Sequence, residues 1–344
     1  MPKSELHPEF LGLAAINNFI PNTSSPRGVM DFSHFSAHLP LLNPDEKVVK
    51  SGIEYELGKY INDIRTDKDC IVKGVVKRYQ GYFNNQSPLI LFVEYEEDGF
   101  IFVDYIDVET YKSNHTFFGY QLKQTDDLTS IGYNSALREG TVLARTDSLG
   151  DNGSYRYGLN ANVVLMSHPS VSEDGYVVSE SFAKRANFNS ITKRVINLSK
   201  NDLLVNLYGD DKTFKFLPDI GEAVRPDGLL CATRKRNDFF SVSDLNHINI
   251  REVDTIFDNL LYVNTNSRVL DIKVVKGYYT RKADGYEITE YTKQLDFYAE
   301  MFNNYYRNIV NTYEEIMKEK KAMYGDSSRV RLTPRLHRLI TDDY

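Results

Sequence analysis

Tryptophan is absent from this 344-residue sequence, and cysteine occurs only at Cys70 and Cys231. Two isolated cysteines exclude a disulfide-built scaffold and are typical of a reducing compartment. No stretch approaches the roughly 18–20 consecutive apolar residues that a membrane-spanning helix needs. The N-terminal segment also lacks the apolar centre of a secretory signal peptide. These absences predict an intracellular protein without a membrane association.

Common catalytic motifs are also missing. The sequence has no GxxxxGKS/T phosphate-binding loop, no GxGxxG dinucleotide fingerprint, no HExxH metalloprotease pair and no GxSxG nucleophile turn. No CxxC pair is present either, which argues against a structural zinc site. The residues alone therefore indicate no self-contained active site.

Positive charge is in deficit, since 41 lysines and arginines face 48 aspartates and glutamates, for a net charge of -7. A freestanding nucleic-acid-binding protein usually has a basic surface, because it displaces counterions from phosphates. Hydrophobic residues make up 41% and charged residues 26%, as in folded chains. The length predicts roughly two or three domains. This charge leaves room for a subunit that meets nucleic acid at one small site.

The middle of the chain is rich in β-branched and aromatic residues and predicts a β-rich α+β fold without a βαβ repeat. We expect a strand at 70–79 and a hairpin over 89–108 with its turn at 96–99. Residues 21–28 predict a loop, because two prolines and three hydroxyl residues fall in eight positions. Further strands are expected at TVLAR (141–145), NANVVLM (160–166) and YVVSE (176–180), and short helices at 181–192 and about 250–262.

Residues 293–323 carry a heptad pattern, in which apolar positions recur at alternating steps of four and three. The resulting seam consists of Leu295, Ala299, Phe302, Tyr306, Ile309, Tyr313 and Ile316. The pattern predicts one long helix that ends at Gly325, a residue type common at helix C-termini. We expect Leu295, Phe302, Ile309 and Ile316 to pack on another chain or on a neighbouring part of this one.

Glu173 and Asp174 are adjacent carboxylates in a polar connection between two expected strands. Such a pair can hold a divalent metal or orient a basic group. A solvated turn is the alternative, and the residues alone do not separate the two. His34 and His38 are four residues apart, a spacing that suits zinc, but no third ligand lies near them in the sequence, so a polar helix face is favoured.

Four segments, taken in order, carry a family resemblance. Residues 24–58 match N-R-x-x-M-G-x-N-M-Q-R-Q-A-V-P-L-L followed by T-G-x-E, through Arg27, Met30, Pro40, Leu41, Gly52 and Glu54. Residues 138–180 match G-x-V-L-A-D-G, then N-G-E-L-A-L-G-x-N-x-x-V-A-F-M, then Y-N-F-E-D-x-I-x-V-S-E. Residues 220–236 are similar to G-A-E-V-x-P-G-D-I-L-V-G-K-V, and residues 268–277 to G-T-V-V-D-V-x-V. Together the segments resemble the β subunit of multisubunit DNA-dependent RNA polymerases.

The resemblance implies a fold and a division of the chain. Residues 1–60 correspond to a fork-like segment, and residues 61–180 to a β-rich region that includes part of a double-psi β-barrel. Residues 181–292 resemble a flap-like β domain, which docks promoter-specificity factors in the family. The heptad-patterned helix at 293–325 and the tail at 326–344 lie outside the matching segments.

Site residues follow from the same resemblance. In the family the Glu-Asp pair lies close to the incoming nucleotide, so Glu173 and Asp174 are expected to give indirect or weak support to the second Mg²⁺, which the nucleotide carries. In two-metal chemistry that ion stabilises the leaving oxygen. Arg27, Glu54 and Lys123 are expected at nucleic-acid or fork contacts, with Lys123 in place of an arginine's charge.

The chain also departs from the family pattern. Phe35 and Ala37 replace the paired glutamines of the fork helix, so the contacts of those glutamines have no counterpart. Neither D-F-D-G-D nor G-D-K-x-x-x-R-H-G-N-K-G occurs, so partner chains would supply the aspartates and lysines of the active centre. We therefore expect no catalytic residue in this chain alone, and no activity of the isolated chain.

The leading hypothesis is a β-like piece of a split RNA polymerase of a giant bacteriophage, which positions template, RNA and incoming nucleotide. A fragment of a longer β-like subunit is the other origin. The implied partners are the remaining β pieces, β′-like pieces, a promoter-specificity factor, DNA template and RNA transcript, with Mg²⁺ held mainly by a partner subunit. The expected location is the cytoplasm of an infected bacterial host, or the virion. The alternative function is a non-catalytic β-like regulatory or mimic protein that binds a polymerase or a specificity factor.

Overall fold

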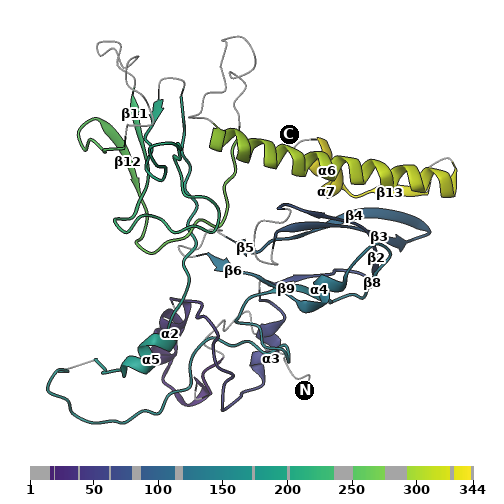
Figure 1. The fold of residues 1–344 in the computed structure, drawn as a ribbon. Coiled ribbons are helices and arrows are strands. Elements are labelled where there is room, and N and C mark those ends of the chain that lie inside the picture. The colour runs from purple at the N-terminus through teal and green to yellow at the C-terminus, as the bar shows by residue number, and fades with distance from the viewer. Residues whose placement is uncertain are drawn as a thin grey trace, which may run out of the picture. The chain divides into compact units, whose positions relative to one another are not determined.

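The computed structural model describes residues 16–18, 20–37, 39–61, 63–79, 87–112, 119–172, 175–199, 202–235, 251–275, 293–325 and 329–341. These residues form a β-rich α+β fold with several separate sheets, as the sequence predicts (Figure 1). The chain divides into two compact units. Unit 1 comprises Met1–Val75, Gln86–Lys193 and Ile316–Tyr344, and unit 2 comprises Val76–Asn85 and Arg194–Glu315.

The largest sheet has five strands in the order β13-β4-β3-β2-β8. Their bounds are Val330–Leu332, Phe100–Val108, Leu89–Glu97, Cys70–Lys77 and Ala136–Leu137, respectively. β3 and β4 form the predicted hairpin, and they pair from Leu89↔Val108 to Glu97↔Phe100. The turn is therefore shorter than predicted, because only Asp98 and Gly99 lie between the strands. Both have positive φ, 52° and 77°, a geometry that matches the right-handed twist of hairpin strands.

Smaller sheets lie beside this one in unit 1. A three-stranded sheet has the order β1-β9-β7, with bounds Ile64–Arg65, Val142–Arg145 and Lys123–Gln124. β5 (Tyr111–Lys112) pairs with β6 (Tyr120–Gln121). The main core of unit 1 includes Val72, Leu91, Leu122 and Leu143, each of which is 0% exposed. Alternate residues of β3 reach this core, as expected for a strand with two different faces.

The helices of unit 1 are short. They are η2 (Ile20–Asn22), α2 (Ser25–Ser36), α3 (Ile53–Gly58), α4 (Asp126–Ser130), α5 (Glu180–Arg185) and α7 (Pro334–Thr341). The loop predicted over 21–28 is wrong, because α2 begins inside it with Pro26 in its first turn. Proline favours that position, since its φ is already helical and its missing N–H would have no partner there. The helix predicted at 181–192 is confirmed only in its first part, because α5 ends at Arg185 and residues 187–192 are not helical.

Unit 2 is built on a three-stranded antiparallel sheet in the order β10-β11-β12. Their bounds are Asp202–Leu204, Leu229–Lys235 and Asp258–Tyr262. The helix predicted at about 250–262 is wrong, since β12 occupies its second half. Pairing with β11 decides this segment, because the strand satisfies its backbone groups against a partner that local propensity cannot see.

The long heptad-patterned helix is confirmed as α6 (Lys293–Tyr324). Gly325 follows with a positive φ of 66°, and its backbone N–H donates to the Lys321 carbonyl at 3.1 Å. Residues of α6 up to Glu315 belong to unit 2, and those from Ile316 belong to unit 1.

Two further features concern the described part of the chain. None of its sheets closes into a barrel. None of its helices is long and apolar enough to cross a bilayer.

Candidate subunit interface

Residues 161–179, here called the interface arm, expose large apolar side chains. Val163, Leu165 and Met166 are 87%, 101% and 69% exposed. In the C-terminal part of the arm, Tyr176 and Val177 are 85% and 62% exposed. In Figure 1 the described part of the arm is the teal stretch without helices or strands that extends beyond α5. The strands predicted at 160–166 and 176–180 are therefore not formed among the described residues.

The composition of the arm explains why the prediction and the structure differ. A continuous apolar run such as Val163–Met166 is typical of a strand that is buried on both faces. A strand also needs a neighbour for its backbone N–H and C=O groups. The described part of this chain offers the arm neither a sheet nor a covering layer. The sequence thus has the pattern of a buried strand pair in a chain that does not bury it.

The described part of the arm's tip is a tight turn. The Val171 backbone N–H donates to the His168 carbonyl at 3.0 Å, and the Ser170 N–H donates to His168 Nδ1 at 3.2 Å. Glu173 and Asp174 follow this turn and lie outside the described residues. Their predicted role therefore stays a prediction. The described residues contain no cluster of three or more potential metal ligands.

Asp45 ties both ends of the arm to one point. Its carboxylate accepts from the Asn160 backbone N–H at 2.9 Å, directly before the arm. It also accepts from Arg185 Nη2 at 2.8 and 2.7 Å, in the helix that follows the arm. These partners lower the pKa of Asp45, with the Asn160 hydrogen bond as the largest contribution and Arg185 second. An ionised carboxylate thus fixes where the arm leaves the domain and where it returns.

Glu46 supports the same region from the adjacent position. Its carboxylate accepts from Asn152 Nδ2 at 2.9 Å and pairs with Lys50. Its backbone carbonyl accepts from Asn160 Nδ2 at 2.8 Å. The two neighbouring acids therefore join the predicted fork-like segment to the segment that precedes the arm.

Glu54, one of the predicted fork contacts, is buried, with its side chain 1% exposed. Its carboxylate accepts from the backbone N–H groups of Ser51, at 3.1 Å, and Gly52, at 2.8 Å, and from Lys47 Nζ at 3.0 Å. Burial raises the pKa of Glu54, but the hydrogen bonds outweigh it and hold the pKa at about 2. In this structure the carboxylate organises the turn that begins α3.

Arg27 and Lys123, the other two predicted contacts, lie on different elements. Arg27 is exposed on α2, where its Nη1 contacts Met30 Sδ at 3.0 Å. Lys123 lies on β7 and pairs with Asp147 at 2.6 Å, with 46% of its side chain exposed. Among the described residues, no side-chain hydrogen bond or ion pair joins Arg27, Glu54 and Lys123 to one another.

The heptad seam is largely covered by this chain. Ile309 and Ile316 are each 2% exposed. Leu295 packs against the core of unit 2 that contains Leu204 and Phe216. Of the two alternatives that the sequence leaves open, Leu295 takes the intramolecular one. Phe302 is half-buried, and Lys273 Nζ lies 4.5 Å from its ring centre.

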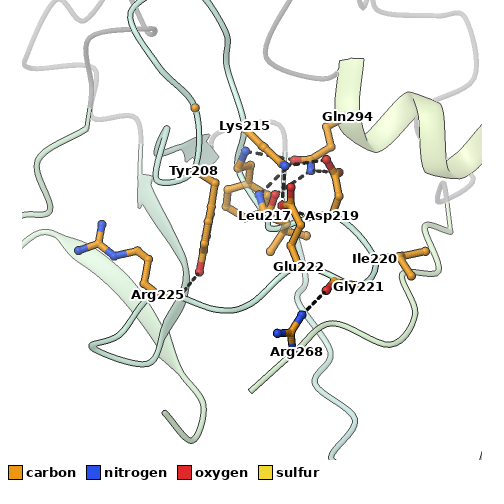
Figure 2. Close-up of polar contacts among 12 residues, drawn as sticks. Tyr208, Lys215, Leu217, Asp219, Ile220, Gly221, Glu222, Arg225, Arg268 and Gln294 are labelled. Atoms are coloured by element: carbon orange, nitrogen blue, oxygen red, sulfur yellow. Dashed lines mark hydrogen bonds and ion pairs between the residues drawn. The ribbon is translucent and has the colours of Figure 1, made fainter. Parts of the chain in front are cut away.

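A polar cluster at the start of α6 was not predicted from the sequence (Figure 2). Gln294 Oε1 accepts from the backbone N–H groups of Phe216 and Leu217, both at 3.1 Å. Its Nε2 donates to the Leu217 carbonyl at 2.7 Å and to Asp219 Oδ1 at 2.9 Å. Tyr298 also donates to Asp219 Oδ1, at 2.8 Å. A glutamine one position before the heptad seam was the available signal, but its partners are about 75 residues away in the sequence.

Comparison with known proteins adds a distant relative. No family model matches the sequence. One curated protein is 25% identical to this chain over 191 residues. It is the DNA-directed RNA polymerase subunit beta of Karelsulcia muelleri (strain GWSS). The match covers 52% of this chain and 13% of the β subunit, so it spans a small part of that relative's length. The likeness is therefore distant and partial, and it relates this chain to one part of an RNA polymerase β subunit.

Proposed function

We propose that this chain is a β-like subunit of a split, phage-type, multisubunit DNA-dependent RNA polymerase. In this role it positions the DNA template, the RNA transcript and the incoming nucleotide, and it has no catalytic residue of its own. The observation that carries the proposal is the interface arm, whose exposed apolar runs fall within the segment that resembles a β subunit. A large exposed apolar surface promotes aggregation of a free-standing protein, whereas a subunit buries it on assembly.

The arm would also explain why the double-psi barrel implied by the resemblance is not closed among the described residues. A double-psi barrel needs strands from more than the segment at 61–180, and the described residues do not close one. The remaining β pieces would supply the missing strands, and the arm would pair with them. β′-like pieces, with a D-F-D-G-D segment, would complete the active centre. A promoter-specificity factor would dock on the flap-like region.

In the assembled enzyme the arm would carry Glu173 and Asp174 to the active centre. Two adjacent carboxylates there would support the nucleotide-borne Mg²⁺, while a partner subunit holds most of the metal. The Asp45 tie would set the direction of the arm. The assembly would act in the cytoplasm of an infected bacterium or from within the virion.

The test is purification of the tagged chain from its native source, with partners identified by mass. We expect companions that contain the D-F-D-G-D and G-D-K-x-x-x-R-H-G-N-K-G segments. Recovery of the chain alone, or only with the host polymerase, would contradict the proposal. It would favour the alternative, a non-catalytic β-like mimic or regulatory protein.

Two variants test whether the arm is the surface that binds the companion chain. The double substitution Val163→Asp and Leu165→Asp should leave the isolated chain folded, because both side chains are exposed. It should reduce co-purification of the β-like companion at least about tenfold, since two charges would be buried at the interface. Val195→Asp, at a site that is 72% exposed, is the control and should leave co-purification unchanged. Equal recovery with the double variant would rule the arm out as the interface.

A further inference from the structure

The C-terminal strand and helix of unit 1 form a strongly positive surface, here called the basic edge. It consists of Arg329, Arg331, Arg335, His337 and Arg338, all of which are exposed. Residues 329–341 contain no aspartate or glutamate, although the whole chain has a net charge of -7. Asp342 and Asp343 follow in the sequence, outside the described residues. Positive charge is therefore concentrated on one short segment of an acidic protein.

The backbone beneath the basic edge is well fixed. β13 pairs in parallel with β4, in the register Val330↔Ile101 to Leu332↔Val103. Thr333 then donates its hydroxyl to Asp104 Oδ1 at 2.6 Å, at the point where the strand turns into α7. Leu336 of α7 is 0% exposed. The backbone that carries the cations is therefore held in place before a ligand arrives, which reduces the entropy cost of binding.

Two arginines of the edge lie over aromatic rings. The guanidinium of Arg331 is 3.5 Å from the ring centre of Phe100, and that of Arg335 is 5.2 Å from the ring centre of Tyr105. Stacking orients the planar guanidinium and leaves its N–H groups, which point outward in its plane, available to oxygen acceptors. Among the described residues, none of the four arginines forms an ion pair.

Nearby acids are already engaged, and the edge itself is accessible. Asp104 accepts from Thr333, and Glu97 pairs with Lys68 at 2.6 Å. β13 is the outermost strand of its sheet in the order β13-β4-β3-β2-β8. No further strand of the described chain covers it. The basic edge thus presents its cations along an open border.

We infer that the basic edge binds the phosphate backbone of a nucleic acid. Guanidinium groups match phosphate oxygens in charge and in bidentate geometry. A polyanion with regularly spaced charges suits this surface, because four arginines lie on one short segment whose only carboxylate contact in the described part of the chain, Asp104, is at its base and accepts from Thr333. The inference goes beyond the proposed function, since residues 329–341 lie outside the segments that resemble a β subunit. It adds a contact surface that the resemblance does not contain.

The experiment measures binding of the full chain to a fluorescent 20-nucleotide single-stranded DNA of mixed sequence, by anisotropy across a range of salt concentrations. The triple variant Arg331→Gln, Arg335→Gln, Arg338→Gln should bind at least tenfold more weakly at low salt. The slope of log K against log salt should become shallower by about 2, because each single-strand phosphate contact contributes about 0.7. The control is Lys59→Gln, Lys184→Gln, Lys212→Gln, which removes the same charge from exposed sites elsewhere and should retain most of the affinity.

Equal affinities of the triple and control variants would overturn the inference. Tighter binding of poly-glutamate than of the oligonucleotide would also overturn it and would assign the edge to an acidic protein. Circular dichroism of each variant checks that the fold is intact. The assay needs no partner chain, so its result is independent of the purification that tests the proposed function.

Discussion

Glu54 is an ionised carboxylate that the protein keeps almost entirely out of water. Four hydrogen-bond donors around it, from the Ser51 and Gly52 backbone, the Ser51 hydroxyl and Lys47, replace the water it loses. Burial alone would raise its pKa, and these donors reverse the effect. The predicted fork contact of Glu54 stays a prediction, and within this chain the carboxylate fixes the turn that begins α3.

This environment predicts a specific acid sensitivity. The pKa of Glu54 is about 2 in the folded chain, against an ordinary value of 4.5, so its ionised form stabilises the fold by roughly 3 kcal/mol at neutral pH. The contribution is complete above about pH 4.5 and is lost as the pH falls towards 2. Glu54→Gln should lower the free energy of unfolding at pH 7 and flatten its fall between pH 4.5 and 2. Denaturant unfolding at several pH values measures both effects.

Glu56→Gln is the matched control for this prediction. Glu56 lies on the same helix, but its side chain is 49% exposed and pairs only with Lys59. An exposed pair of this kind contributes little to stability. If the Glu54 and Glu56 variants unfold alike at every pH, the buried network does not have the proposed effect.

A single glycine shows how closely the two matching segments of unit 1 approach. A Cβ atom added to Gly58, at the end of α3, would lie 1.9 Å from the Gly153 carbonyl oxygen. Gly153 directly follows Asn152, which donates to Glu46. The close approach explains why a residue without a side chain is needed at this position, which sequence spacing alone does not reveal.

At the scale of elements, the first turn of α6 is joined to the 216–222 loop by the side-chain amide of Gln294, which makes hydrogen bonds like those of a peptide group. The Gln294 amide accepts from two N–H groups and donates to a carbonyl and a carboxylate, as a strand neighbour would. Lys215 also pairs with Asp219, at 2.6 Å. Burial alone would raise the pKa of Asp219, but hydrogen bonds from Lys215, Tyr298 and Gln294 outweigh this effect and hold the pKa below its ordinary value. The helix and the 216–222 loop are therefore stabilised together.

Gln294→Glu tests this arrangement with almost no change in size. The carboxylate cannot donate to the Leu217 carbonyl, and it places a second negative charge beside Asp219. We expect a loss of about 1–3 kcal/mol in the free energy of unfolding, because a buried acceptor loses its donor. Hydrogen exchange should show faster opening of residues 216–222 than in the parent chain.

Asn303→Asp provides the comparison, since it introduces the same charge on the exposed side of α6. It should leave the free energy of unfolding and the exchange of the loop nearly unchanged. A similar loss in both variants would mean that charge on the helix, rather than the Gln294 contacts, causes the effect.

At the scale of the whole molecule, the chain combines well-packed sheets with an arm that it does not bury. Unit 1 has a continuous core beneath its five-stranded sheet, and unit 2 has its own smaller core. The interface arm has strand-like composition but no strand neighbour among the described residues. Under the proposed function, the chain would fold first and bury its arm on assembly.

The proposed enzyme predicts a separation of assembly from catalysis. Glu173→Ala together with Asp174→Ala should leave the complex intact, because the proposed contacts with the companion chain come from the apolar side chains of the arm. Nucleotide addition by the purified complex should be slower, most clearly at limiting Mg²⁺, since support for the nucleotide-borne ion is lost. Elongation assays over a Mg²⁺ series measure this effect. Elongation at the parent rate throughout the series would remove the pair from the active centre.

Local patterns in the sequence were sufficient for the elements whose partners are close by. The β3–β4 hairpin follows from two apolar runs joined by Asp98-Gly99, and α6 follows from its heptad seam. The coarse α+β, β-rich class follows in the same way. The four ordered segments resemble a β subunit, and a protein that is 25% identical over 52% of this chain is such a subunit.

Only the tertiary structure decided which patterned segments find partners. The runs at 160–166 and 176–180 have strand composition, but a strand exists only where another backbone satisfies its hydrogen bonds. β12 formed where a helix was expected, because β11 lies beside it. Long-range partners also decide the roles of two side chains. Asp45 binds Asn160 before the arm and Arg185 after it, and Gln294 of α6 binds the distant loop at 216–222. Sequence determines what each segment can pair with, and the fold determines which of those pairings this chain contains.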